Sequence, residues 1–418
     1  PVENPSDQFM EDEEARIVDR ARSEFPGGYL VDFPEDRIQE RVEATANALA
    51  RDEPAIFNAT FLEEGVVVCV DILALKGRGY SLIEVKPETS IQPHHLWEVA
   101  VQAYVLRRAG VDVDSVEVMH LNEECRFPAL DDLFVAESIS GRVRGLYPQI
   151  SGIISKQKKV LDGPLPEVEV GEHCDKPTSC PFKDRCWPTL PKHHVETFYG
   201  LRREKSAQMK AQELTQVEEV PGSFPLTIIQ QRQQRSVVEG EVQVEDGLAG
   251  ALAPLQGRVA YLDFRTVPLS IPAWVGMGPW QDHPVQFGCR VAQANGDVEH
   301  SDWLADGRVD SRAVMAQALL ETLDGVDVVV AYDKAAQKRC LEAIASAVPE
   351  QTRELMAISS KTMDLLPAVR DNVYHPDFLG SFELTSVLPA LVPSFGYEPL
   401  EVSEGQSVEA LLHRLLFS

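Results

Sequence analysis

The chain has 418 residues and a formal net charge of −27, with 44% apolar and 25% charged residues. This length allows two or three domains, each with its own core. No apolar run approaches the ~20 residues of a membrane-spanning helix, and the first residues lack the basic and then apolar stretches of a signal peptide. We therefore expect a cytoplasmic protein with no membrane partner. The net negative charge disfavours a non-specific nucleic-acid-binding protein, because neutralisation of phosphates needs clustered Lys and Arg. It is compatible with an enzyme whose acidic residues hold cations.

The first half of the chain alternates between helical and strand-like patterns. Its strands are short β-rich runs separated by Gly-containing turns, and its helices end at Gly or Pro signals. A helix, a three-strand meander, a helix and a strand together predict an α/β core around one sheet. We expect helices over 13–24, 37–51, 93–109, 138–160 and 197–215, and strands over 55–61, 66–75, 80–86 and 116–121.

The second half begins after a stretch rich in Pro, Gln and Gly, residues 217–255, which we interpret as a linker. Asn295-Gly296 between two apolar runs is the strongest hairpin signal in the chain. Three antiparallel strands, a helix, a strand and a helix follow the order of a ribonuclease-H-like fold. The predicted strands are 259–264, 285–292, 297–304 and 326–332, and the predicted helices are 312–323 and 334–348.

The first candidate site lies in the meander. Asp71 interrupts an apolar strand, where a carboxylate is costly unless it is paired or binds a cation. In the next strand Glu84 and Lys86 share one face, because side chains alternate along a strand. The short turn at 76–79 brings the two strands together, so Asp71, Glu84 and the Val85 carbonyl can ligate one Mg²⁺ or Mn²⁺, while Lys86 faces a scissile phosphate. The alternative without a functional site is a surface hairpin whose charged residues face water.

These residues resemble the signature of RecB-like nucleases of the PD-(D/E)XK superfamily. The resemblance covers about residues 55–110 and implies a restriction-endonuclease-like core that hydrolyses phosphodiester bonds. It also implies a role for a Gln on the following helix, for which Gln102 is the candidate. An early helix supplies a further ligand in many members, and Glu14 is the candidate here.

A second cluster consists of Cys174, Cys180 and Cys186. Three thiols in a Pro- and His-rich loop of a cytoplasmic protein indicate a metal or iron–sulfur site before a disulfide. The stretch is similar to the cysteine segment of iron–sulfur nucleases in the same superfamily, which implies a [4Fe–4S] cluster held by four thiolates. The fourth ligand would lie upstream of this chain or be His173, Cys69 or Cys125, and zinc is the alternative metal.

The third candidate site resembles an exonuclease site that lacks some of its acidic residues. Asp263 opens a motif that reads Asp-x-Glu in DnaQ-like exonucleases, but Arg265 stands in the second acidic position and cannot ligate a cation. Asp333 and Gln337 occupy the next motif, and Asp364 is a further acidic candidate. We expect this domain to be non-catalytic, with Arg265 either contacting a phosphate or pairing with Asp263 or Asp364.

Taken together, the chain resembles a bacterial family that fuses a RecB-like nuclease, a cysteine cluster and a DnaQ-like domain. The predicted domains are 1–196, a helix and linker over 197–256, and 257–418. The leading hypothesis is Mg²⁺- or Mn²⁺-dependent hydrolysis of DNA, with RNA as another possible substrate, and with the second domain binding substrate or a protein partner. One alternative is a non-catalytic scaffold in a repair or defence complex, and another is an exonuclease that acts through Asp263, Asp333 and Asp364.

Overall fold

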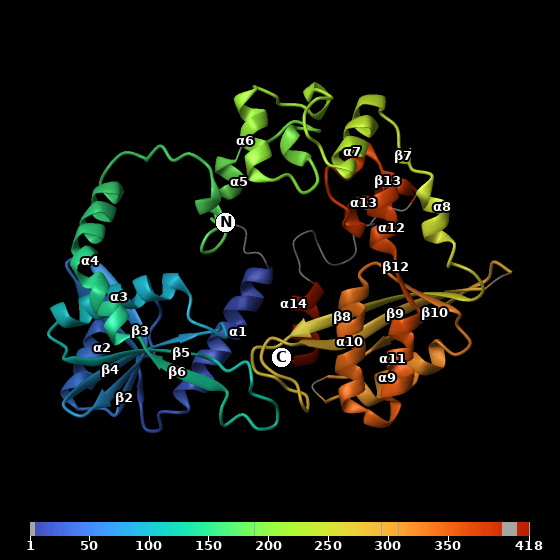
Figure 1. The fold of residues 1–418 in the computed structure, drawn as a ribbon. Coiled ribbons are helices and arrows are strands. Elements are labelled where there is room, and N and C mark those ends of the chain that lie inside the picture. The colour runs from blue at the N-terminus through green and yellow to red at the C-terminus, as the bar shows by residue number, and fades with distance from the viewer. Residues whose placement is uncertain (1–4, 188, 294, 308, 395–407, 418) are drawn as a thin grey trace. The chain divides into compact units, whose positions relative to one another are not determined.

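The computed structural model describes residues 5–187, 189–293, 295–307, 309–394 and 408–417 as a mixed α/β protein (Figure 1). The chain divides into two compact units. Unit 1 comprises Pro1–Cys186 and Pro268–Gln281, and unit 2 comprises Trp187–Val267 and Asp282–Ser418. These units differ from the predicted boundaries at 196 and 256, because a short segment of the second half packs with unit 1 and the predicted linker carries structure of its own.

Unit 1 is built on a six-stranded sheet with the order β1-β2-β3-β4-β5-β6. β1 is parallel to β2 and β4 is parallel to β5, whereas the other neighbours are antiparallel. The β-branched and aromatic residues of the predicted meander favour a pleated, buried surface, and tight turns join its strands. The strands are β1 (Tyr29–Leu30), β2 (Ala55–Glu63), β3 (Val66–Lys76), β4 (Gly79–Lys86), β5 (Val113–Leu121) and β6 (Phe134–Ser138).

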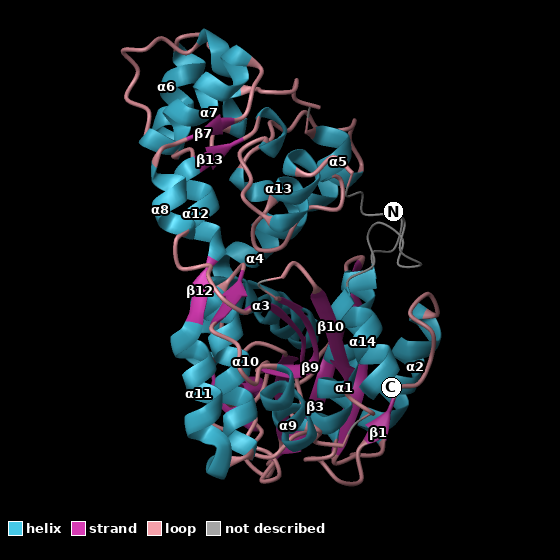
Figure 2. Ribbon diagram, turned by 90° about the vertical axis from the view of Figure 1, so that its right-hand side faces the viewer, coloured by secondary structure: helices cyan, strands magenta, loops and turns pink. Residues whose placement is uncertain are grey.

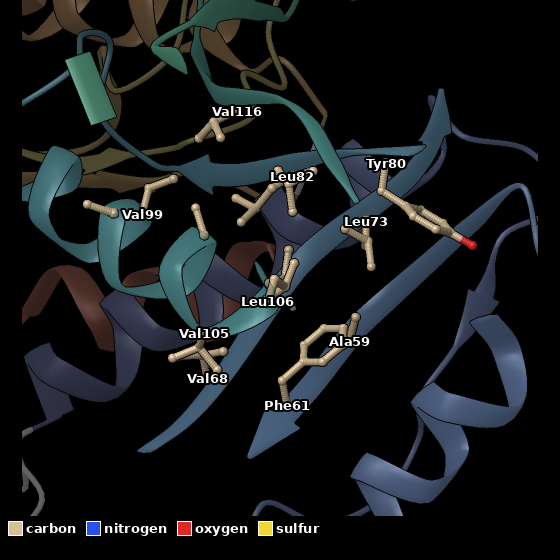
Figure 3. Packing of buried hydrophobic residues seen from close by; sticks show 14 of the residues in the cluster. Ala59, Phe61, Val68, Leu73, Tyr80, Leu82, Val99, Val105, Leu106 and Val116 are labelled. Carbon is tan, nitrogen blue, oxygen red and sulfur yellow. The ribbon is translucent and has the colours of Figure 1, made fainter. Parts of the chain in front are cut away.

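Helices cover both faces of this sheet. Buried residues of α2 (Ile38–Ala50), α3 (Pro93–Arg108) and α4 (Ser140–Leu161) pack on one face. Those of α1 (Pro5–Arg22) pack on the other. Figure 3 shows Val99 and Leu106 of α3 beside Leu73 and Leu82 of the sheet. The later part of unit 1 adds a 3-10 helix (Glu172–Cys174) and the short α5 (Lys183–Cys186).

The alternation of side chains changes face in the middle of β2 and β3. Val70 and Leu73 both pack on the α3 side, whereas Ile72 packs on the α1 side. Positions 70 and 73 share a face only if the regular period of two is broken between them. The break in β2 coincides with Asn58, whose φ of 55° lies in the left-handed region that Asn tolerates better than most residues. Asp71 occupies the break in β3.

A segment from the second half of the chain completes unit 1. This closing segment, Pro268–Gln281, connects β8 (Val259–Pro268) to β9 (Asp282–Ala292). Buried Glu13 of α1 accepts hydrogen bonds through Oε2 from the backbone N–H and the hydroxyl of Ser270, at 2.8 and 2.5 Å. Further along, Trp280 donates its indole N–H to the carbonyl of Pro87 at 2.6 Å.

Unit 2 contains a five-stranded sheet of order β10-β9-β8-β11-β12. It also contains a small β13-β7 pair (Figure 2). β9 and β10 form the predicted hairpin, and β11 is parallel to both β8 and β12. Along the chain, β8, β9, β10, α9 (Arg312–Thr322), β11 and α10 (Lys334–Ala347) follow the predicted order of three strands, a helix, a strand and a helix. Beside β8 and β9, unit 2 contains β7 (Gln243–Val244), β10 (Val298–Leu304), β11 (Val328–Ala331), β12 (Thr362–Asp364) and β13 (Val373–Tyr374).

Helices of unit 2 lie before, between and after these strands. The predicted linker contains α7 (Ile228–Glu239), which begins at a capping box formed by Thr227 and Gln230. Within the described ranges, no helix is both long and apolar enough to cross a membrane. The remaining helices are α6 (Arg203–Ala211), α8 (Gly247–Leu252), α9 (Arg312–Thr322), α10 (Lys334–Ala347), α11 (Thr352–Lys361), α12 (Leu365–Asn372), α13 (Leu384–Leu391) and α14 (Val408–Phe417), with 3-10 turns at Val195–Thr197, Val217–Glu219, Pro349–Gln351 and Pro376–Phe378.

Candidate active site

Asp71 and Glu84 come together where the β3–β4 ladder ends. The last paired residues on this side are Ile72 and Ile83, so the next two positions are Asp71 and Glu84. Instead of a backbone carbonyl, the Asp71 carboxylate accepts the N–H of Val85, with 2.8 Å between Oδ2 and N. The side chain of Asp71 thus replaces one rung of the ladder, and it fixes the two carboxylates beside each other at the edge of the apolar core.

Lys86 is held between two carboxylates. Its Nζ lies 3.0 Å from Oε1 of Glu84 on the same strand and 2.8 Å from Oε2 of Glu98 on α3. The Lys86 and Glu84 side chains are only 11% and 6% exposed, whereas Glu98 is 44% exposed. Water therefore reaches the ammonium group mainly from the Glu98 side.

Gln102 fixes the second oxygen of Glu84. Its amide Nε2 donates to Glu84 Oε2 at 2.9 Å and to the carbonyl of Cys69 at 3.1 Å. Glu98 and Gln102 stand one turn apart on α3, so both side chains reach the same place on the sheet. The structure therefore places the predicted Gln102 in contact with Glu84. Glu98 was missed in the sequence, although its spacing from Gln102 was a usable signal.

Burial and neighbouring charges shift the pKa values of Asp71, Glu84 and Lys86. It raises the pKa of Asp71 to about 6, although the Val85 N–H and the Lys86 charge oppose the shift. Burial, and then the charge of Asp71, raise the pKa of Glu84 well above its ordinary value. Burial alone would lower the pKa of Lys86, but the carboxylates of Glu84 and Glu98 outweigh it and raise that pKa. Lys86 is therefore a permanent cation, whereas burial destabilises the ionised forms of the neighbouring Asp71 and Glu84.

Glu14 of α1 belongs to the same electrostatic group. Partial desolvation and the charges of Glu88 and Glu98 raise the pKa of Glu14, while Lys86 lowers it. The Glu14 charge in turn raises the pKa of Asp71. Nothing in the sequence distinguishes Glu14 from the other acidic residues of its helix, so its location depends on how α1 packs against β4.

The donor set suits a hard divalent cation. Asp71 and Glu84 offer oxygen atoms only, and Mg²⁺ commonly binds through one or two carboxylates while keeping several waters. A cation between them would relieve the repulsion that raises the pKa of Glu84. The Val85 carbonyl remains a predicted third ligand, since the hydrogen bond to Asp71 involves only its N–H.

Glu88, His94 and His95 form a second group near the end of β4. Their ligand atoms lie within 4.8 Å of one another, and Glu88 Oε1 is 3.3 Å from Nε2 of buried His95. The N–H of Gln92 donates to His95 Nδ1 at 3.1 Å, so a neutral His95 carries its proton on Nε2. Burial lowers the pKa of His95 and favours that neutral form. A cation at Nε2 would force this proton onto Nδ1 and break the Gln92 bond, so the geometry suits the 3.3 Å contact between His95 and Glu88 better than a metal site.

The three clustered cysteines lie in the loop that ends unit 1. The N–H of Cys180 donates to the carbonyl of Cys174 at 2.7 Å, and Cys186 ends α5. Among the residues whose positions are described, these thiols are not gathered closely enough to ligate a single ion. A [4Fe–4S] cluster separates its thiolates more widely, so this cluster stays a prediction. The zinc alternative also stays a prediction, and it requires the thiols to move closer together than they lie here. The candidate fourth ligands Cys69 and Cys125 contact Arg41 and the Ala129 carbonyl instead, and no group of ligand atoms among the described residues includes His173.

In unit 2 the predicted exonuclease residues are only partly brought together. A pocket of about 210 Å³ is lined by Asp263, Asp333 and Gln337, but not by Arg265 or Asp364. Arg265 pairs with Asp263 at 3.1 Å, which is one of the two roles that we considered for it.

The acidic residues of that pocket region also have structural roles. Asp333 caps α10 by accepting the N–H groups of Ala335 and Ala336, and Asp364 caps α12 by accepting the N–H of Leu366. Gln337 is buried, and in the described part of the chain neither of its amide atoms has a hydrogen-bond partner.

Comparison with known proteins bears mainly on unit 2. Residues 260–383 match a family model described as "Domain of unknown function (DUF2779)". A solved structure titled "ExoI/SSB-Ct complex" is similar over 28% of this chain and 30% of its own length, with 15% identity and a TM-score of 0.18. No curated protein matches the chain. The family match leaves the Asp71 site outside it.

Proposed function

We propose that unit 1 is a metal-dependent nuclease that hydrolyses phosphodiester bonds at Asp71, Glu84 and Lys86. The observation that carries the proposal is the pairing of half-buried Asp71 with buried Glu84, with Lys86 held beside them by Glu84 and Glu98. A structural ion pair would need only one carboxylate for one lysine. Partly desolvated carboxylates in excess of the local cations favour a site that is completed by an added cation.

Each residue has a distinct part in the proposed reaction. Asp71, Glu84 and the Val85 carbonyl would hold Mg²⁺ or Mn²⁺, which lowers the pKa of bound water and neutralises phosphate charge. Lys86 donates hydrogen bonds to the scissile phosphate and offsets the charge that develops on it. Glu98 keeps the ammonium of Lys86 at the open side of the site, and Gln102 keeps the Glu84 carboxylate in one orientation.

The test is cleavage of end-labelled single- and double-stranded DNA, and of RNA, by anaerobically purified protein with Mn²⁺. We expect cleavage by the parent, a loss of at least 100-fold in Glu84→Ala, and no change in the matched variant Asp263→Ala. Cleavage that survives Glu84→Ala but is lost in Asp263→Ala would refute the proposal and move the activity to unit 2. No cleavage by any folded variant would favour the scaffold interpretation.

A further inference from the structure

A pocket of about 580 Å³ opens just beyond the end of β4. One wall is the β4–α3 connection, which includes Pro87, Glu88 and Ser90, and another is Met10 of α1. The third wall is the end of the closing segment, with Trp280. Glu88 follows Lys86 by two residues, so the pocket begins next to the candidate active site. Its size is within the range of sites that take one small organic ligand.

Trp280 is fixed in this wall by an unusual backbone. Its φ is 58°, a left-handed conformation that is rare for a bulky aromatic residue. Two hydrogen bonds hold it there: its backbone N–H donates to the Leu269 carbonyl at 2.7 Å, and its indole N–H donates to the Pro87 carbonyl at 2.6 Å. Strained residues that are held from several sides are concentrated at functional sites. The indole is therefore presented to the pocket as a fixed surface.

The chemistry of the walls favours a nucleobase over a phosphate. Met10, Pro87, Pro279 and Trp280 supply apolar and aromatic surface. The charged residues in the lining are acidic, Glu88 and Glu123, and these would repel a phosphate. A carboxylate instead accepts hydrogen bonds from the N–H groups of a base. Aromatic side chains provide stacking platforms for bases of any sequence.

We propose that this pocket binds one unpaired nucleobase next to the scissile phosphate by stacking it on Trp280. This inference rests on the proposed nuclease function and names its substrate class. Bases inside a duplex are stacked and paired, so they do not reach a side pocket unless the strand is single or frayed. The enzyme therefore selects single-stranded nucleic acid or unpaired ends.

The test uses the full chain and a set of single-stranded DNA substrates, each with one abasic residue near the cleaved bond. We expect one abasic position to lower kcat/KM of the parent about tenfold, the size of a lost stacking contact. Trp280→Ala should cleave the abasic and intact substrates equally, whereas Trp280→Phe should retain the discrimination, because phenylalanine keeps an aromatic face. The ratio of two substrates with one enzyme sample is insensitive to the fraction of folded protein.

Binding is measured separately, without divalent ions, through the quenching of 2-aminopurine at the same position of the DNA. Quenching by the parent and by Trp280→Phe, but not by Trp280→Ala, supports the pocket even if no variant cleaves DNA, in which case only the nuclease function fails. Two results would refute base binding in this pocket and leave the nuclease function standing. One is a parent that cleaves every abasic substrate as fast as the intact one, and the other is a Trp280→Ala variant that discriminates between them as strongly as the parent.

Discussion

Replacing Asp71 with Asn should stabilise the metal-free protein at neutral and alkaline pH. The pKa of Asp71 is raised from 3.8 to about 6 in the folded protein, so the folded state binds more protons than the unfolded state between these values. Stability must then fall as pH rises through this window. Two pH units at about 1.4 kcal/mol each correspond to about 3 kcal/mol above pH 6. Asn keeps an oxygen for the Val85 N–H but carries no charge to desolvate.

Calorimetry in EDTA from pH 4 to pH 8 measures this effect, and the transition that Asp71→Asn shifts is assigned to unit 1. At pH 8 we expect the unit 1 transition of Asp71→Asn to lie about 6–12 °C above that of the parent, and the difference to shrink toward pH 4. Mn²⁺ should raise the parent transition and leave that of the variant nearly unchanged. A difference that is constant from pH 4 to pH 8 would refute the assignment of a buried, titrating carboxylate.

Three further substitutions test other parts of the structure, and a fourth tests the cysteine loop. Gln102→Ala frees a buried oxygen of Glu84, and single-turnover cleavage should slow about tenfold or more; an unchanged rate would contradict its orienting role. Glu13→Gln weakens the bonds to the closing segment and should cost unit 1 about 1–3 kcal/mol in urea unfolding. Gln337→Met removes two amide atoms that have no hydrogen-bond partner in the described structure, so it should stabilise unit 2 by about 1–3 kcal/mol. A lower free energy of unfolding in the variant would show that these amide atoms have partners. Cys180→Ala should remove bound iron from anaerobically purified protein, whereas zinc in the parent would favour the alternative metal.

The strands and their pairing around the candidate site were predictable because they depend on local signals. Runs of strand-forming apolar residues and Gly-containing turns located β3 and β4 to within a few residues, and a hairpin necessarily brings Asp71 near Glu84. The break in alternation at Asn58 and Asp71 was not predicted, since it depends on one left-handed residue in a neighbouring strand. An Asn within an apolar strand was the available signal.

Contacts between distant parts of the sequence were beyond prediction. Glu14 reaches the region around the end of β4 from the first helix, and only the family resemblance named it as a candidate. Trp280 reaches the same region from the second half of the chain, and no local pattern specifies where such a residue packs. The predicted linker over 217–255 was read from composition, but the capping box at Thr227 begins a helix there. The apolar periodicity of this stretch is low because α7 buries polar side chains, among them Gln230 and Arg232, in place of apolar ones.

The closing segment has a consequence for how this gene product can vary. Because Pro268–Gln281 belongs to unit 1 although it is encoded inside unit 2, the two units are not exchangeable cassettes. A protein that acquired only the first 186 residues would carry a buried Glu13 carboxylate without its Ser270 donors, and a loop change between β8 and β9 would alter the first unit rather than the second. Recombination between homologous genes would therefore preserve the packing of unit 1 only when both crossover points keep this stretch with its own unit 1.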